Sequence, residues 1–172
     1  PYRSSFSEKD DDRFLGSLTV EPLSRGMGIT LGNAMRRILL SSIESAAVTS
    51  LKIPGVQQEF SSIPGVLEDV IDIVINLKGL DVRLSGDPRG QKFMLEFQGP
   101  GGVFADSIRG GTNLEILNPH HKICTVTDDI QLSMEIGIER GVGYVPSEEM
   151  DTTSFGTILV DAQFSPIVNA NY

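Results

Sequence analysis

The segment EPLSRGMGITLGNAMRRILLSS, residues 21–42, is the most informative part of the sequence for the fold. Pro22, Gly26 and Gly28 keep its first part out of regular structure. Thr30 then stands where a helix N-cap is expected, and the apolar residues after it recur at helical spacing. The pattern predicts a helix over residues 30–42. Its core-facing stripe holds Leu31, Ala34, Met35, Ile38 and Leu39.

The side of this helix opposite the stripe is only partly polar. It holds Asn33, Arg36 and Arg37, but also Leu40, which lies nearly opposite Leu31 at about 100° per residue. One interpretation is a single exposed apolar residue, which is common on protein surfaces. The other is a second buried face against another subunit, where the arginines at its rim bind carboxylates or carbonyls. Spacing alone leaves both interpretations open.

The same segment carries a weak nucleotide-binding signal. Gly26, Gly28 and Gly32 nearly match the glycine fingerprint of dinucleotide sites, and they lie between a predicted strand at residues 15–20 and the helix. Such a site also needs an acidic residue at the end of the next strand, and the strand predicted at residues 49–53 has none there. A nucleotide-binding enzyme that uses this loop is therefore the weaker alternative to a structural turn. Two adjacent arginines without a basic stripe around them do not predict nucleic-acid binding either.

Composition and charge restrict the classes of function. The 172 residues suffice for one domain or two small ones, and the formal net charge is −9. Because phosphate backbones repel such a chain on average, we expect no direct DNA contact and a basic protein partner instead. The single Cys124 excludes an internal disulfide framework and suits a reducing compartment. No apolar run has membrane-spanning length, so we expect no membrane partner.

The rest of the chain predicts one more helix and many short strands. Residues 1–16 are polar and acidic and predict a mobile N-terminal arm, with a strand at residues 14–21. Residues 63–77 contain a β-branched run, but Pro64 at the start, Gly79 beyond the end and the length of the segment favour a helix. Extended segments are predicted at residues 47–53, 57–61, 80–85, 92–98, 114–117, 122–127, 132–139 and 157–164. The predicted fold class is α+β.

Patterns that would indicate catalysis or metal binding are weak. His120, His121 and Cys124 form HHxxC, but a metal site usually needs four ligands and the chain has no other cysteine or histidine. The acidic residues between positions 148 and 151 lie in a polar stretch that predicts a solvated loop. The serine pairs lack the context of a nucleophile elbow. We predict no catalytic residue, cofactor or metal, and the residues alone indicate an interaction protein.

Several segments, in order along the chain, resemble one family: the N-terminal domain of the α subunit of bacterial-type DNA-directed RNA polymerase. The resemblance covers nearly the whole chain and is specific because many separate motifs agree. The matching segments are EPLSRGMGITLGNAMRRILLSS at residues 21–42, AVT at 47–49, EFS at 59–61, GVLED at 65–69, NLKGL at 76–80, RGVGYVP at 140–146 and LVDAQFSP at 159–166.

The resemblance implies a fold in two parts. An α/β dimerisation subdomain, residues 1–44 and 166–172, is interrupted by a mostly antiparallel β insert subdomain, residues 45–165. In this family the dimerisation subdomain continues past the position of Tyr172 with a strand and a helix, and a linker then leads to a separate domain that contacts DNA.

The resemblance also implies a function: a non-catalytic assembly subunit of the nucleotidyltransferase complex DNA-directed RNA polymerase. Its partners would be a second α copy, giving a homodimer, and the large β and β′ subunits. A diverged polymerase assembly factor is a further alternative. The expected location is the cytoplasm, at the nucleoid as part of polymerase, with a plastid as the other option. Arg37 matches the position most tied to β contact. The implied subunit-interface residues are Asn33, Arg36, Arg37, Leu40, Glu59, Glu68, Asp69, Lys78 and Asp161.

Overall fold

The computed structural model describes residues 3–9, 12–86, 91–151 and 154–172. Within them it forms two α-helices, α1 (Met27–Ser41) and α2 (Val70–Lys78), and two short 3-10 helices, η1 (Ala105–Ser107) and η2 (Ser147–Glu149). The strands are β1 (Arg3–Lys9), β2 (Asp12–Glu21), β3 (Glu44–Lys52), β4 (Val82–Leu84), β5 (Gln91–Gln98), β6 (Gly101–Phe104), β7 (Ile108–Arg109), β8 (Leu114–Ile116), β9 (Lys122–Val126), β10 (Gln131–Val142), β11 (Tyr144–Val145), β12 (Thr157–Leu159) and β13 (Ala162–Gln163). Helices among several small antiparallel sheets confirm the predicted α+β class.

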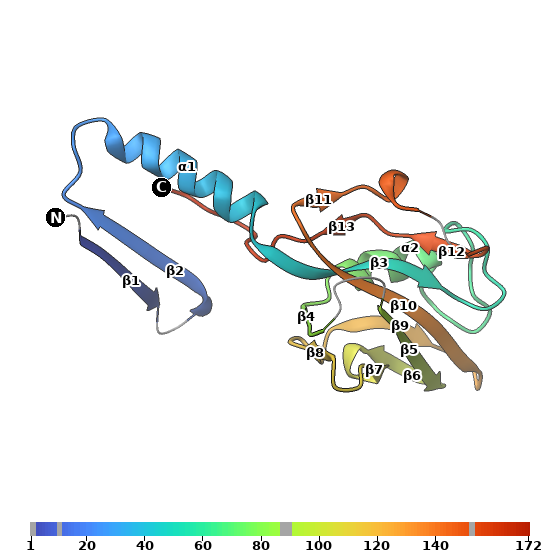
Figure 1. Ribbon diagram of the computed structural model, residues 1–172. Coiled ribbons are helices and arrows are strands. Elements are labelled where there is room, and N and C mark those ends of the chain that lie inside the picture. The colour runs from blue at the N-terminus through green and yellow to red at the C-terminus, as the bar shows by residue number, and fades with distance from the viewer. Residues whose placement is uncertain (1–2, 10–11, 87–90, 152–153) are drawn as a thin grey trace.

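The elements from β3 to β13 form the larger of two lobes (Figure 1). A five-stranded antiparallel sheet, in the order β12–β3–β10–β5–β7, lies at the centre of this larger lobe. The long strand β10 pairs with β3 on one side and with β5 on the other. Alternate side chains of β10 point into the core, because successive residues of a strand face opposite sides of the sheet. Leu132, Met134, Ile136 and Ile138 are accordingly buried.

The helix α2 packs on the core through one face. Val70, Ile73 and Leu77 are fully buried, whereas Ile75, on the other side of the helix, is 59% exposed. Gly79 ends the helix as predicted, and its N–H donates to the carbonyl of Asn76. Spacing of three and four residues between the buried positions is what a one-sided helix requires.

The hairpin β1–β2 and the helix α1 lie outside the larger lobe (Figure 1). Residues 3–6 and 15–47 are all at least partly exposed. The segment after Phe164 runs back along α1, and the ring of Tyr172 occupies the space that a side chain on Gly32 would need. This contact ties the last described residue to the helix. The subdomain boundaries at residues 44–45 and 165–166 stay a prediction.

The prediction of a mobile arm at residues 1–16 is wrong for its described part. β1 pairs with β2 in an antiparallel register that begins at Arg3 opposite Glu21 and sets Phe6 opposite Leu18. The ring of Phe6 also covers Gly16. Strand pairing satisfies backbone donors and acceptors whatever the side chains are, so polar composition did not prevent a hairpin. Residues 1–2 and 10–11 lie outside the described residues.

The predicted start of the first helix is also wrong. α1 begins at Met27, and Gly26 rather than Thr30 is its N-cap. Gly26 has a φ of 88°, a left-handed conformation that glycine adopts with little steric cost. The loop therefore turns directly into the helix, and Gly28 lies inside the first turn.

The second helix is predicted correctly in kind but not at its start. α2 begins at Val70, not near residue 63. Gly65 has a φ of 80°, which breaks the helix, and the following residues pair with β9 instead. The N–H of Leu67 donates to the carbonyl of Thr125, and Val66 forms a bridge to Val126.

Two predicted extended segments differ from the structure. Residues 57–61 form a turn that is closed by the N–H of Ser61 donating to the carbonyl of Gln58. Residues 157–164 divide into β12, which pairs with β3, and β13, which pairs with β11. The division occurs where the chain leaves one sheet for another. The strands β6, β7 and β11, each of two to four residues, were not predicted.

Candidate docking surfaces

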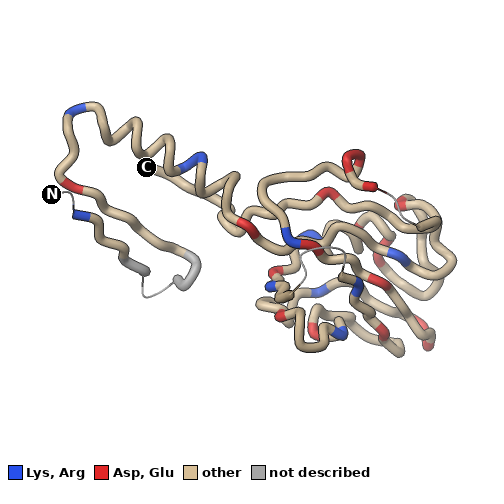
Figure 2. The backbone as a smooth tube through the Cα atoms, in the orientation of Figure 1, with Lys and Arg blue, Asp and Glu red and all other residues tan. Residues whose placement is uncertain are grey.

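The helix α1 carries the first group of predicted interface residues. Asn33, Arg36 and Arg37 are exposed and Leu40 is half-buried. No residue of this 15-residue helix is buried, and Ile38 in its predicted core-facing stripe is 58% exposed. Figure 2 shows few charged residues along the helix and the tail beside it. A helix whose apolar residues its own chain covers only in part is typical of an interaction surface.

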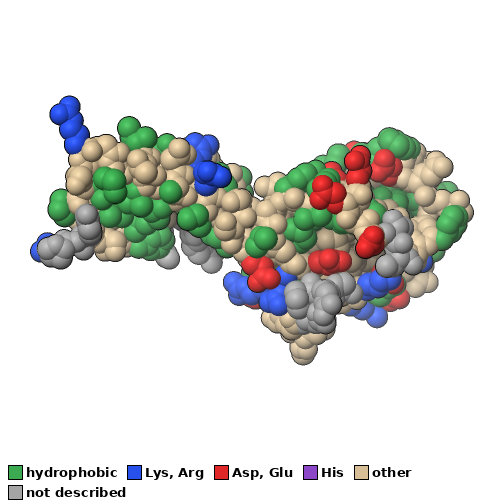
Figure 3. Space-filling view, turned by 45° about the horizontal axis from the view of Figure 1, so that its top comes forward, with side chains coloured by type: hydrophobic (Ala, Val, Ile, Leu, Met, Phe, Trp, Pro, Cys, Tyr) green, Lys and Arg blue, Asp and Glu red, His purple; other side chains and the backbone are tan. Residues whose placement is uncertain are grey.

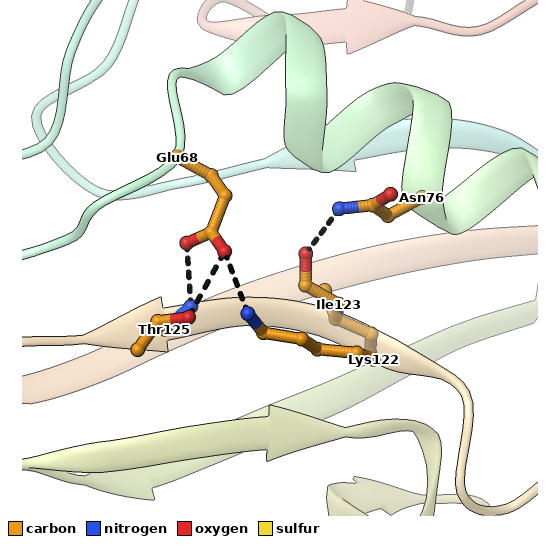
Figure 4. Close-up of polar contacts among 5 residues, drawn as sticks. All are labelled: Glu68, Asn76, Lys122, Ile123 and Thr125. Carbon is orange, nitrogen blue, oxygen red and sulfur yellow. Dashed lines mark hydrogen bonds and ion pairs between the residues drawn. The ribbon is translucent and has the colours of Figure 1, made fainter.

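Glu68 lies at the centre of a polar network between the segment that leads into α2 and the strand β9 (Figure 4). Its carboxylate accepts hydrogen bonds from the backbone N–H of Thr125 at 2.6 Å and from the Thr125 hydroxyl at 2.9 Å. The ammonium of Lys122 lies 3.2 Å away, and the Glu68 side chain is 16% exposed. Partial burial by itself would raise the pKa of Glu68, but these donors outweigh it and hold the pKa below its ordinary value. Glu68 therefore fastens the segment before α2 to β9.

This network predicts a pH-dependent stability. A carboxyl whose pKa is depressed in the folded state stabilises it above the unfolded pKa of about 4.3, and the contribution is lost as the pH falls through the folded pKa. We expect Glu68→Gln to lower the free energy of unfolding by about 1–3 kcal/mol near pH 7. The difference between Glu68→Gln and the wild type should shrink as the pH is lowered below about 4.3.

Urea unfolding of both proteins across pH 3–7 measures this difference. Glu115→Gln is the matched control, because Glu115 pairs with Arg83 at an exposed site where ion pairs contribute little. If the difference in the free energy of unfolding between Glu68→Gln and the wild type stays constant with pH, the charged carboxylate does not have this stabilising role.

A second set of hydrogen bonds joins α2 to β9. The side-chain amide of Asn76 donates to the carbonyl of Ile123 at 2.8 Å (Figure 4), and the Nε2 of His121 lies 2.7 Å from the backbone carbonyl of Asn76. Because a carbonyl only accepts, Nε2 carries the proton. Cys124 is fully buried, and burial raises its pKa to about 12. His121 thus holds α2 against the start of β9, and Cys124 is a residue of the buried core.

Lys78 and Asp161, two predicted interface residues, lie next to each other. The Lys78 ammonium is 3.5 Å from the Asp161 carboxylate, and both side chains are more than a third exposed. The backbone N–H of Ser147 donates to Asp161 at 2.9 Å. This backbone bond, with Lys78 assisting, holds the pKa of Asp161 below its ordinary value. Asp161 therefore joins the end of α2 to the start of η2.

Glu59 lies at a groove on the larger lobe. The groove has a volume of about 510 Å³. Phe60, which follows Glu59 in the chain, is 77% exposed and lines both this groove and an adjoining hollow of about 250 Å³. Asp69, also predicted at an interface, lines the second hollow. The residues around the main groove are Gln57, Gln58, Glu59, Phe60, Ser147, Glu148, Thr157, Ile158 and Leu159.

The predicted interface residues fall into separate groups. Those of α1 lie outside the larger lobe, whereas Glu59, Glu68, Asp69, Lys78 and Asp161 all belong to it (Figure 1). Phe60 lies in the matching motif EFS at residues 59–61 but was not predicted as an interface residue. An aromatic residue beside a glutamate in a polar stretch is the signal that could have indicated it. Thr125 gave no signal, because it lies 57 residues from Glu68 in sequence.

The alternative sites receive little support from the geometry. Gly32 of the glycine pattern lies inside α1 and is covered by the Tyr172 ring, which leaves no room there for a phosphate. Within the described residues no three side chains of histidine, cysteine, aspartate or glutamate gather as a metal site. In the same part of the chain, no helix has both the length and the apolar character required to cross a membrane.

Comparison with known proteins identifies the family. Residues 51–165 match the family model of the RNA polymerase Rpb3/RpoA insert domain. The chain belongs to this family. It is also 49% identical, over 158 residues, to the DNA-directed RNA polymerase subunit alpha of Roseiflexus sp. (strain RS-1). That alignment covers 91% of the chain and 49% of the relative, so the chain spans about half of the relative's length. The resemblance to polymerase α subunits is thereby confirmed.

Proposed function

We propose that this chain is a non-catalytic assembly subunit of DNA-directed RNA polymerase, which pairs with a second copy of itself and docks the large β and β′ subunits. The relative's name and the family match support a role within polymerase. The proposed location is the cytoplasm, where the assembled polymerase acts on the nucleoid.

One observation carries this proposal: α1 is apolar on several sides and buries no residue within its own chain. Ile29 and Ile38 are 70% and 58% exposed, and Leu40 is only half-buried. The apolar area that this helix leaves exposed does not stabilise a monomer, because apolar area stabilises a protein only when it leaves water. A second copy and a large subunit would remove that area from water.

The larger lobe offers a second docking surface. Glu59 and Phe60 lie at the groove, Asp69 lies in the adjoining hollow, and Lys78 and Asp161 form an exposed pair. We assign this surface to a large subunit and the α1 surface to self-association and β. The residues 1–44 with 166–172 then form the dimerisation subdomain, and residues 45–165 form the insert subdomain.

Size-exclusion chromatography of the chain, alone and mixed with purified β or β′, tests the proposal. We expect the chain alone to elute as a concentration-dependent dimer and the mixtures to give a joint peak. If the chain stays monomeric and associates with neither large subunit, the proposal is refuted. Titration with nucleotides, which we expect to show no binding, tests the glycine-loop alternative in the same samples.

A further inference from the structure

The strand β12 has a free edge. It pairs with β3 on one side, and among the described strands no other pairs with its opposite side. The N–H of Val160 donates to the carbonyl of Thr49 at 2.9 Å. Because hydrogen-bonded and non-bonded pairs alternate in an antiparallel ladder, Ile158 bonds to β3 and Leu159 does not. The N–H and C=O of Leu159 therefore point outward, away from the sheet.

The groove runs along this edge. Thr157, Ile158 and Leu159 line it together with the turn that carries Phe60. Ser147 and Glu148 also line it, and the hydrogen bond from Ser147 to Asp161 holds them in place. A groove that presents unpaired backbone groups beside an exposed aromatic ring has the features of a site for strand addition.

The charged residues that line the groove and the adjoining hollow are all acidic. Glu59 and Glu148 line the groove, and Asp69 and Asp72 line the hollow on the other side of Phe60. Figure 3, turned so that the top of Figure 1 comes forward, shows acidic side chains among apolar ones on the larger lobe. A ligand that fits this arrangement carries positive charges on both sides of an apolar residue.

We propose that an extended segment of a partner polypeptide adds to the free edge of β12, with an apolar side chain against Phe60 and lysine or arginine side chains beside Glu59 and Glu148. The backbone of the segment bonds to Leu159, and the side chains select the segment. The inference rests on the proposed function in one respect, since that function makes the partner a large polymerase subunit.

Residue-resolved hydrogen exchange of the chain, alone and bound to purified β or β′, tests the strand addition. The Leu159 amide should exchange quickly in the free chain and at least about tenfold more slowly in one of the two complexes. The Ile158 amide, already bonded to β3, is the internal control and should be protected in both states. If the chain binds both β and β′ but the Leu159 amide exchanges as fast in both complexes as in the free chain, the inference is wrong.

Substitutions test whether side chains of the groove contribute to binding of the segment. Glu148→Lys should weaken binding of the same subunit about tenfold, and Phe60→Ala should weaken it at least as much. Asp106→Lys makes the same charge change at an exposed residue of η1, outside the groove, and should bind as wild type does. If Glu148→Lys and Asp106→Lys bind equally well, the charge match is refuted. If wild type binds neither subunit, the proposed function fails, and the strand addition fails with it.

Discussion

Replacing Arg37 with alanine is expected to weaken docking of the β subunit about 30-fold, the change that 2 kcal/mol at an interface hot spot produces. Arg37 is exposed on a helix that buries none of its residues, so its guanidinium is available to a partner. The fold should be unaffected, because substitutions at exposed sites usually change stability by less than about 0.5 kcal/mol. Calorimetric titration of β, with thermal unfolding of the isolated chain, measures both effects.

Arg83→Ala is the matched control for this prediction. Arg83 is an exposed arginine of the larger lobe, on β4, and its ion pair with Glu115 has both side chains more than half exposed. Its loss should change neither docking nor folding appreciably. If Arg37→Ala unfolds the isolated chain, or if it binds β as tightly as Arg83→Ala does, the assignment of Arg37 to the β contact is refuted.

Ile73→Ala is expected to lower the free energy of unfolding of the larger lobe by about 2–5 kcal/mol, whereas Ile75→Ala should change it by less than about 0.5 kcal/mol. Ile73 is fully buried and Ile75 is 59% exposed, on opposite sides of α2. The first substitution leaves a cavity in the core, and the second removes atoms that already face water. Urea unfolding of the two variants beside wild type measures the difference.

The two variants also test whether residues 70–78 form a helix or the strand that their β-branched residues suggest. In a strand, residues two apart share a face, so both substitutions would have similar effects. Equal losses of stability would therefore contradict the helix α2. Because both variants lose the same atoms from the same residue type, helix propensity and unfolded-state effects cancel between them.

The sequence predicted those elements whose signals are local. Gly79 ended α2 as expected, and the alternation in β5 and β10 identified the strands of the central sheet. The failures arose where a single backbone conformation or a distant partner decides the structure. Gly26, at positive φ, is the N-cap of α1, and Gly65, also at positive φ, interrupts the helix predicted from residue 63. The sequence does not show which of its glycines have a positive φ.

The candidate surfaces were predictable to a similar extent. The resemblance pointed to Lys78 and Asp161 separately, but their pairing depends on a fold that brings residues 83 positions apart to 3.5 Å. Glu68 was expected at an interface, and its hydrogen bonds to Thr125 appeared only in the structure. The free edge of β12 was also beyond prediction, because residues 157–164 gave no sign that they serve two sheets.

Sedimentation velocity of the chain, titrated with purified β, tests directly whether it is an assembly subunit. We expect a complex that contains two copies of the chain and one β, formed from a self-associating chain whose α1 surface becomes covered. The Arg37→Ala variant should still self-associate but form this complex only at higher concentration. If the chain sediments as a monomer at every concentration and binds neither β nor β′, it is not an assembly subunit.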